Sequence, residues 1–115
     1  MIAINRSVKP IVGLVRGGAI GFGTTITTLM DFVYCSPDAF FSTPFMKSAQ
    51  SPEGSATYSF AQYYGYRKAN EILLLDKKVR AHEAKAAGYI NDVLDNLGND
   101  YFPDLDKIPA IRKLV

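Results

Sequence analysis

Residues 10–31 read Pro-Ile-Val-Gly-Leu-Val-Arg-Gly-Gly-Ala-Ile-Gly-Phe-Gly-Thr-Thr-Ile-Thr-Thr-Leu-Met-Asp and carry the strongest structural signal in the chain. Residues 11–15 are a short, nearly continuous apolar run rich in β-branched side chains, of a length that suits a strand buried on both faces. A glycine cluster follows the run. Beyond it, apolar side chains recur at the spacing of one helix face, at Phe22, Ile26, Leu29 and Met30. The stretch therefore predicts a strand, a glycine-rich turn and a helix that begins near Gly21.

The glycine-rich turn is where we expect the chemistry of this protein. Backbone N–H groups at the start of a helix stabilise a phosphate or a developing oxyanion, because the helix dipole is positive there. A second interpretation of the same glycines is structural. They would then allow a tight turn and close helix–strand packing without any ligand.

The composition indicates one globular domain. A chain of 115 residues that is 48% hydrophobic can bury a core but is too short for two domains. No apolar run approaches the roughly 18 residues of a membrane span, and the N-terminus does not have the pattern of a signal peptide, so we expect a soluble, intracellular protein. The net charge is only +2 and the basic residues are scattered, which argues against nucleic-acid binding.

Two residue types that often carry chemistry occur only once each. Cys35 is the only cysteine, which excludes an intrachain disulfide, and its apolar surroundings indicate a small buried side chain. His82 is the only histidine and lies in a polar stretch, so no histidine-based metal site can be assembled. The sequence therefore predicts no metal site and no role for either residue.

Turn residues predict the boundaries of the remaining elements. Residues 32–35 and 39–43 are strand candidates on either side of a Ser-Pro-Asp turn. The first should lie parallel to residues 11–15, because a helix joins the two. Ser51 as N-cap and Pro52 as the first helical residue predict a helix over residues 52–64. The later segments are predicted as helices over 66–75 and 81–87, the second closed by Gly88, then an extended segment over 89–94 and a last helical turn over 111–114.

Two short motifs together suggest a nucleotide-binding enzyme. Gly17, Gly21 and Gly23 spell G-x-x-x-G-x-G after a strand, which is the pattern of short-chain dehydrogenases. Tyr64 and Lys68 spell the Y-x-x-x-K of the same enzymes. A dinucleotide site needs further βαβ units between these motifs. Fewer than about 50 residues separate them, little more than one unit of about 30 residues, so this alternative is disfavoured.

Glu53 is the carboxylate best suited to acid–base chemistry. Partial desolvation would make it a stronger base, because its neighbours in the sequence are apolar or aromatic: Pro44, Phe45, Met46, Pro52, Tyr58 and Phe60. A base beside an oxyanion site can remove a proton α to a carbonyl group. The alternative is that Glu53 only complements the dipole of the helix that would begin at Pro52.

Four segments resemble the crotonase (enoyl-CoA hydratase/isomerase) superfamily, in the family's order, over roughly residues 9–94. Residues 9–21 resemble its K-P-x-I-A-x-V-N-G-x-A-x-G segment, and residues 31–36 its following D-x-x-x-A-S strand. Residues 41–45 and 50–55 are similar more narrowly to the peroxisomal-type Δ3,Δ2-enoyl-CoA isomerases. Residues 75–90 resemble its G-K-x-x-x-A-x-E-A-x-x-x-G-L-V segment. The resemblance implies an α/β fold, a partial crotonase-like ββα spiral in which a strand, a glycine-rich turn and a helix are followed by C-terminal helices.

The resemblance also assigns roles to individual residues. It places an oxyanion-binding backbone N–H at Phe22, with substrate contacts at Ala19, Gly21 and Gly23. It places the acid–base group of the isomerases at Glu53, and the acyl pocket at Phe45 and Met46. The two catalytic glutamates of the hydratases would fall at Thr25 and Phe45, which are not acidic. The resemblance therefore implies isomerisation and argues against hydration.

One carboxylate is enough for the isomerase reaction. It can take the C2 proton of a 3-enoyl thioester and return it at C4 while N–H donors hold the enolate oxygen. The implied substrate is a coenzyme A thioester in the β-oxidation of unsaturated fatty acids, and no separate cofactor is needed.

The sequence departs from the family pattern in two respects. Arg16 replaces the family's asparagine. The family's N-terminal half, which supplies the other oxyanion donor and much of the CoA site, has no counterpart here. Residues 1–115 thus resemble a single partial crotonase-like domain: a fragment, an incomplete gene model or a degenerate paralogue of an isomerase. A second hypothesis is a non-catalytic crotonase-like protein that binds acyl-CoA or associates with full-length subunits.

Assembly and location are expectations from the resemblance alone. A full-length relative would form a homo-oligomer, a trimer or a hexamer. The implied location is the peroxisome, with the mitochondrial matrix as the alternative. The last four residues, Arg-Lys-Leu-Val, differ from the Ser-Lys-Leu peroxisomal signal.

Overall fold

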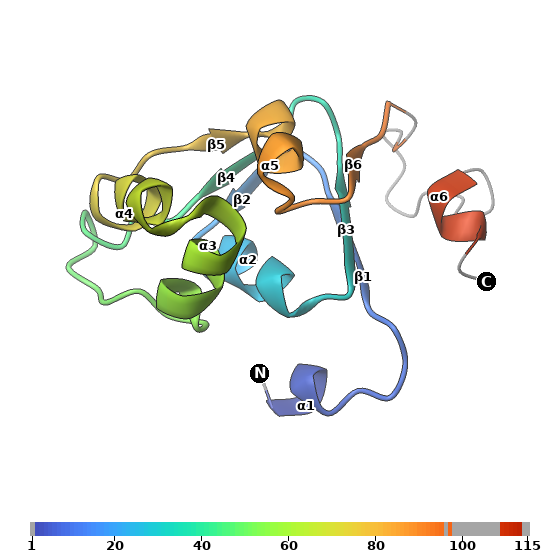
Figure 1. Ribbon diagram of the computed structural model, residues 1–115, viewed down its shortest axis with the longest axis horizontal. Coiled ribbons are helices and arrows are strands. Elements are labelled where there is room, and N and C mark those ends of the chain that lie inside the picture. Colours follow the sequence, from blue (N-terminus) through green and yellow to red (C-terminus); the bar gives the residue numbers. More distant parts are fainter. Residues whose placement is uncertain (1, 96, 98–108, 114–115) are drawn as a thin grey trace.

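Two three-stranded sheets form the frame of the chain (Figure 1). The computed structural model describes residues 2–95, 97 and 109–113. The first sheet has the order β1 (Val12–Val15), β3 (Phe32–Cys35), β6 (Asp92–Val93), with both pairs parallel. The second has the order β2 (Gly18–Ile20), β4 (Phe40–Ser42), β5 (Val79–Arg80), with β2 parallel and β5 antiparallel to β4.

The predicted pairing of β1 with β3 is confirmed. Gly13 lies opposite Val33 and Val15 lies opposite Cys35 in a parallel ladder. The chain crosses from one strand to the other through α2 (Phe22–Thr25) and a 3-10 turn, η1 (Ile26–Leu29). A crossover of this kind is required because a tight hairpin can join only antiparallel strands.

The glycine cluster contains a strand, which the sequence did not reveal. Gly18–Ile20 form β2, so the chain leaves the first sheet after Val15 and enters the second sheet before α2 begins. A Cβ atom on Gly18 would come within 2.6 Å of the Phe40 ring, so a side chain there would force the ring to move. The structural interpretation of the glycines is supported only in part: Gly17 and Gly21 turn with φ of 65° and 58°, but nothing lies within 4 Å of a Cβ atom on Gly17, Gly21 or Gly23, so close packing does not account for them.

Threonines occupy the buried side of α2 and η1. Thr24, Thr25 and Thr27 are 1%, 0% and 5% exposed, whereas Phe22 is 46% exposed. The predicted apolar face was therefore wrong at Phe22. The reason is that the helix tightens to a 3-10 turn at Ile26, so a 3.6-residue period does not run through the segment. The buried hydroxyls are tolerated because each one donates to a backbone carbonyl.

The described residues form five further helices: α1 (Ile2–Asn5), α3 (Ala56–Tyr64), α4 (Tyr66–Leu74), α5 (Ala81–Ala87) and α6 (Pro109–Arg112). The predicted helices over 66–75 and 81–87 are confirmed. Gly88 ends α5 with φ +78°, as predicted. The buried face of α4 consists of Ala69, Ile72 and Leu73.

The helix predicted over residues 52–64 begins four residues later than expected. Ser51 is not its N-cap and Pro52 is not its first residue, since α3 starts at Ala56. Gly54 and Ser55 have φ of 65° and 62°, in the left-handed region. Two consecutive left-handed residues cannot belong to a right-handed helix, so the chain turns here before α3 can begin.

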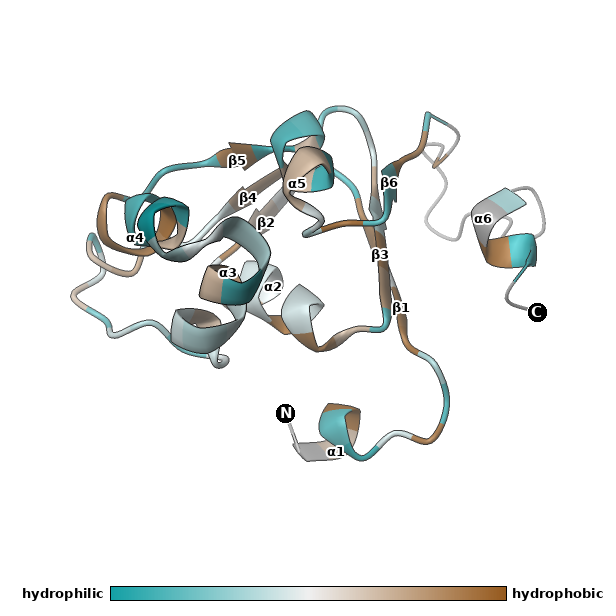
Figure 2. Cartoon of the chain, viewed as in Figure 1, coloured by the Kyte–Doolittle hydropathy of each residue, from teal (hydrophilic) through white to brown (hydrophobic). Residues whose placement is uncertain are grey.

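One apolar cluster joins the two sheets to α3, α4 and α5. Its largest fully buried side chains are Phe41, Phe45, Phe60 and Ile72. Figure 2 shows hydrophobic residues along β1, β2 and β3. The central strands of the two sheets, β3 and β4, are the most buried. Cys35 is fully buried in this cluster, as predicted, and burial, with Asp38 and Asp92 nearby, raises the pKa of its thiol to about 11.

Three further expectations concern the C-terminal helical turn, membrane-spanning helices and metal-ligating side chains. The last predicted helical turn overlaps α6, and Leu114 lies outside the described residues. No helix within the described ranges is both long and apolar enough to cross a membrane. The same residues contain no group of three metal-ligating side chains that could hold an ion.

Candidate active site

The backbone at the start of α2 presents two N–H groups that the helix itself does not use. Gly21 is fixed first, because its N–H donates to the Ser42 carbonyl at 2.8 Å. The N–H groups of Thr24 and Thr25 then donate to the Gly21 carbonyl, at 3.0 and 3.1 Å. The first N–H groups of a helix have no intrahelical acceptor, which leaves those of Phe22 and Gly23 for a ligand. Both residues are exposed, so the predicted oxyanion position is accessible.

The Thr24 side chain links this turn to the second sheet by hydrogen bonds. Its Oγ1 atom lies 2.6 Å from the Ala19 carbonyl oxygen and 3.0 Å from that of Ser42, and it accepts the Ser42 N–H at 3.2 Å. Ala19 and Ser42 belong to β2 and β4, so one buried hydroxyl connects α2 with two strands. Sequence reasoning missed Thr24, because residues 23–28 read Gly-Thr-Thr-Ile-Thr-Thr and nothing there distinguishes one threonine from the others.

The segment that contains Glu53 lies against α2. A Cβ atom on Gly54 would be 2.7 Å from Thr25 Oγ1 and 2.8 Å from Thr25 Cβ. Thr25 in turn donates its hydroxyl to the Phe22 carbonyl at 3.3 Å. The structure therefore brings the neighbour of Glu53 to within one helical turn of Phe22, although the two segments are about thirty residues apart in the sequence.

The surroundings of Glu53 differ from both sequence-based interpretations. Its side chain is exposed and not desolvated, although the sequence neighbours are apolar. The reason is that Tyr58 and Met46 are themselves 69% and 42% exposed, while Phe45 and Phe60 point into the core. Glu53 also precedes α3 instead of lying in its first turn, and its carbonyl accepts the Ala56 N–H at 3.0 Å. A dipole-complementing role in the first helical turn is therefore wrong.

The two residues assigned to the acyl pocket are placed differently. Phe45 is 2% exposed and belongs to the core cluster, whereas Met46 is 42% exposed. Of the two, only Met46 presents its side chain to a ligand. A cavity of about 620 Å³ lies elsewhere, at the ends of β1 and β3, where it is lined by Arg16, Ser36 and Asp38 among others. Neither Phe22 nor Glu53 lines it, so volume alone does not identify the predicted site.

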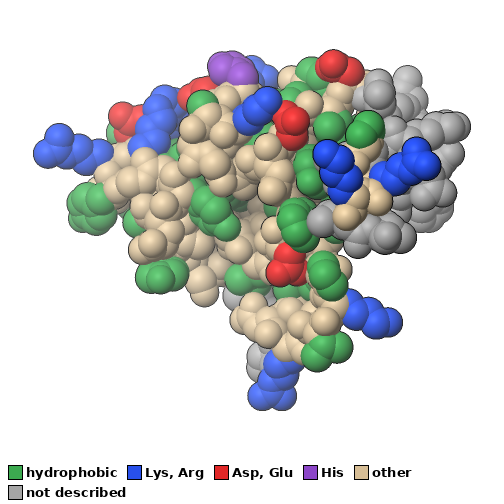
Figure 3. All heavy atoms as spheres, turned by 45° about the vertical axis from the view of Figure 1, so that its right-hand side comes forward, with side chains coloured by type: hydrophobic (Ala, Val, Ile, Leu, Met, Phe, Trp, Pro, Cys, Tyr) green, Lys and Arg blue, Asp and Glu red, His purple; other side chains and the backbone are tan. Residues whose placement is uncertain are grey.

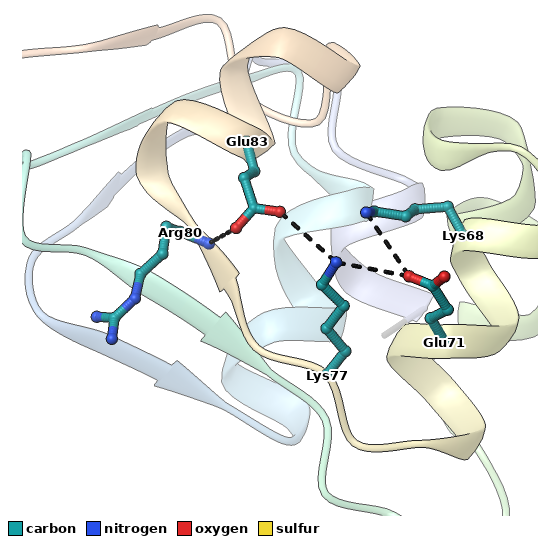
Figure 4. Close-up of polar contacts among 5 residues, drawn as sticks. All are labelled: Lys68, Glu71, Lys77, Arg80 and Glu83. Atoms are coloured by element: carbon teal, nitrogen blue, oxygen red, sulfur yellow. Dashed lines mark hydrogen bonds and ion pairs between the residues drawn. The ribbon is translucent and has the colours of Figure 1, made fainter.

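Charged side chains of both signs lie on the surface. On the face in Figure 3 the Lys and Arg side chains are interspersed with Asp and Glu. Figure 4 shows one chain of ion pairs, in which Glu71 lies 3.6 Å from Lys68 and 3.5 Å from Lys77, and Lys77 lies 3.9 Å from Glu83. These contacts connect α4 with α5. Exposed pairs of this kind contribute little to stability.

The dehydrogenase alternative is not supported by the geometry. Tyr64 ends α3 and Lys68 lies in α4, with Gly65 between the two helices at φ +78°. The motif residues therefore do not share one helix face. Burial, with Tyr89 and Glu83 nearby, raises the pKa of the Tyr64 phenol, which is opposite to what a catalytic base requires.

Comparison with known proteins agrees with the resemblance found in the sequence. Residues 1–98 match the family described as "Enoyl-CoA hydratase/isomerase". Rat enoyl-CoA delta isomerase 2 and mouse peroxisomal enoyl-CoA delta isomerase 3 are each 45% identical over 85 residues, 74% of this chain. The human testis-specific chromodomain protein Y 1 is 41% identical over the same length.

The chain spans only part of these proteins. It covers 22% of the rat isomerase, 27% of the mouse isomerase and 16% of the human chromodomain protein. A solved structure of a putative enoyl-CoA hydratase/carnithine racemase from Magnetospirillum magneticum superposes with a TM-score of 0.81 and 31% identity, over 98% of this chain and 42% of that one. A putative enoyl-CoA hydratase/isomerase from Acinetobacter baumannii gives a TM-score of 0.75 and 38% identity, over 80% and 41%.

Proposed function

The chain belongs to the enoyl-CoA hydratase/isomerase family, and from this premise we propose that it carries part of the active site of an enoyl-CoA delta isomerase. The reaction moves a double bond from 3-enoyl-CoA to 2-enoyl-CoA in the oxidation of unsaturated fatty acids. The 45% identity to two proteins named as delta isomerases supports this reaction.

In the proposed mechanism, Glu53 acts as both base and acid. Its carboxylate takes a proton from C2 of the 3-enoyl thioester, and the electron pair moves onto the thioester oxygen as an enolate. The N–H of Phe22 donates to that oxygen. The enolate then collapses to the 2-enoyl thioester while Glu53 returns the proton at C4. The substrate is the coenzyme A thioester itself, and no separate cofactor takes part.

The single observation that carries this proposal is the contact of Gly54 with Thr25. It fixes the residue after Glu53 against the helix whose first N–H is that of Phe22. A base and an oxyanion donor must flank the same thioester for a proton shift to occur. The fold thus supports the pairing of Glu53 with Phe22, which lie on separate segments of the sequence.

Hydration is not expected from this site. Hydratases use two catalytic glutamates to add water across a double bond. By the resemblance, these glutamates would fall at Thr25 and Phe45, and neither residue is acidic. Both are fully buried here, and the Thr25 hydroxyl is engaged with the Phe22 carbonyl. Neither can activate water.

We infer that further residues complete the site around Glu53, which is exposed in this chain. The matched isomerases extend well beyond the 85 residues that they share with this chain. We infer that such residues cover Glu53, supply a second donor for the enolate oxygen and hold most of the coenzyme A. A peroxisomal location is part of the same proposal and is supported by the name of the mouse relative.

The test is a fusion of this chain with the parts of the mouse isomerase that lie outside the matched residues. The fusion is expected to convert 3-enoyl-CoA to 2-enoyl-CoA, which is measured by the absorbance of the conjugated thioester. It is also expected to show little hydration of 2-enoyl-CoA. A folded fusion without isomerisation, beside an active mouse enzyme, would overturn the proposal. Hydration as fast as isomerisation would overturn the choice of reaction.

The alternative is a non-catalytic protein that binds acyl-CoA or associates with full-length subunits. The exposure of the Glu53 side chain to solvent favours it, because an exposed carboxylate is not activated as a base by desolvation. Calorimetric binding of a CoA thioester by the folded fusion, without turnover, would distinguish this alternative from the isomerase.

A further inference from the structure

Tyr89 connects the aromatic core to the turn that carries Phe22. It follows Gly88 at the end of α5 and is 4% exposed. Its ring meets Phe41 and Phe60 edge-on, with centroids 5.2 and 5.6 Å away, and lies tilted against Tyr64 at 5.2 Å. These ring contacts hold the side chain in one orientation, so the position of its hydroxyl is determined by the core.

The hydroxyl of Tyr89 contacts Thr24 in α2 and Thr27 in η1. It donates to the Thr24 carbonyl at 2.7 Å and lies 2.7 Å from Thr27 Oγ1. The Thr27 hydroxyl lies 2.7 Å from the same carbonyl. Two hydroxyl hydrogens thus serve three short, buried contacts. Burial raises the pKa of Tyr89, partly offset by the Thr27 hydrogen bond, so the phenol keeps its proton at physiological pH.

Thr24 is consequently held from two sides. Its side chain is bonded to Ala19 and Ser42 in the second sheet, and its carbonyl is bonded to Tyr89 in the core. The residues between the anchored Gly21 and the anchored Thr24 are Phe22 and Gly23. Their peptide planes cannot rotate freely while both anchors are in place.

We propose that Tyr89 is a positioning residue for the enolate-stabilising N–H of Phe22. The inference rests on the proposed isomerase function. Aromatic packing alone does not require the hydroxyl. The two hydrogen-bond partners of this hydroxyl, Thr24 and Thr27, both belong to the turn between the sheets.

The proposal predicts where the energetic effect falls. Negative charge on the thioester oxygen develops only as the C2 proton leaves, so a misaligned N–H weakens the transition state more than the bound substrate. Loss of the Tyr89 hydroxyl should lower kcat and leave KM nearly unchanged.

The first test uses the 115-residue chain and does not depend on activity. Amide hydrogen exchange is compared between Tyr89→Phe and Tyr64→Phe, which removes a hydroxyl from the same aromatic cluster. Tyr89→Phe should speed exchange at Thr24, Thr25 and Ile26 by about three- to tenfold, the scale of one lost hydrogen bond. Exchange at Ser36 and Leu94, which report the first sheet, should not change. Equal acceleration at both sets of amides, or none at the turn, would overturn the positioning role.

The second test places both variants in the active fusion. Tyr89→Phe should lower kcat about three- to tenfold at constant KM, and Tyr64→Phe should leave both parameters unchanged. An unchanged kcat for Tyr89→Phe contradicts the proposal. An inactive parent fusion contradicts the proposed function instead, and the exchange experiment then still decides whether Tyr89 orders the turn.

Discussion

Gly54 lies so close to Thr25 that a methyl group on Gly54 would come within 2.7 Å of the threonine Oγ1 atom. Gly54 has φ +65°, and Thr25 is fully buried, so neither partner can move away easily. This contact determines where Glu53 stands relative to α2.

Gly54→Ala should destabilise the protein and displace residues 51–54 from α2. The left-handed backbone costs an L-residue about 1–2 kcal/mol, and the clash with Thr25 adds to that cost. We expect a total loss of about 2–4 kcal/mol in denaturant unfolding. Gly88→Ala is the matched control, because Gly88 has φ +78° but nothing within 4 Å of its missing Cβ. Equal losses for the two variants would show that the contact with Thr25 is unimportant.

Thr24→Val should reveal the value of the buried hydroxyl that ties α2 to β2 and β4. Valine keeps the shape but leaves the Ala19 carbonyl without this donor, so we expect a loss of about 1–3 kcal/mol. Thr28→Val serves as the control, since the Thr28 hydroxyl bonds only the Thr25 carbonyl within its own helical turn. A Thr24→Val protein as stable as the Thr28→Val protein would contradict this reading of the site.

Cys35 should make stability depend on pH in the alkaline range. Burial raises the pKa of the folded thiol from 9.0 to about 11, so the unfolded chain releases this proton first as the pH rises. The contribution is fully present below pH 9.0 and is lost between pH 9.0 and about 11. Relative to Cys35→Ala, wild type should lose on the order of 2 kcal/mol across that window. The tyrosines also affect stability at alkaline pH, but they are the same in both proteins, so the comparison isolates Cys35. If the free energy of unfolding falls equally with pH in the two proteins, Cys35 has no such effect.

The strands were predictable because their signal is local. The runs at residues 11–15 and 32–35 have the length and residue types of buried strands, and they form the parallel pair that was predicted. The expected burial on both faces is not reached in β1, where only Gly13 is buried, and the chain between the two runs contains β2 as well as a helix. The short strands β2 and β5 were missed. Gly18–Ile20 and Val79–Arg80 become strands through pairing with β4, which is a tertiary effect that their own residues do not encode.

Glu53 and Phe22 are predicted as site residues from the order of the family-like segments, and this remains a prediction. Their surroundings could not be predicted, because the exposure of Glu53, Tyr58 and Met46 is set by the tertiary structure. The start of α3 was misplaced because Ser51 and Pro52 are good helix-starting residues on their own. In the structure Gly54 and Ser55 have left-handed backbones instead, at the point where Gly54 packs against Thr25.

The last prediction concerns Glu53 in the active fusion. Glu53→Gln keeps the size and hydrogen bonding of the side chain but cannot carry a proton, so kcat should fall roughly 10²-fold or more with KM nearly unchanged. Stability should change by less than about 0.5 kcal/mol, because Glu53 is exposed and lies outside α3. Glu71→Gln and Glu83→Gln are the controls, since both carboxylates belong to the ion pairs of Figure 4 and should leave kcat intact. If Glu53→Gln retains near-normal turnover, the proton is carried by another group, and the contact of Gly54 with Thr25 serves packing alone.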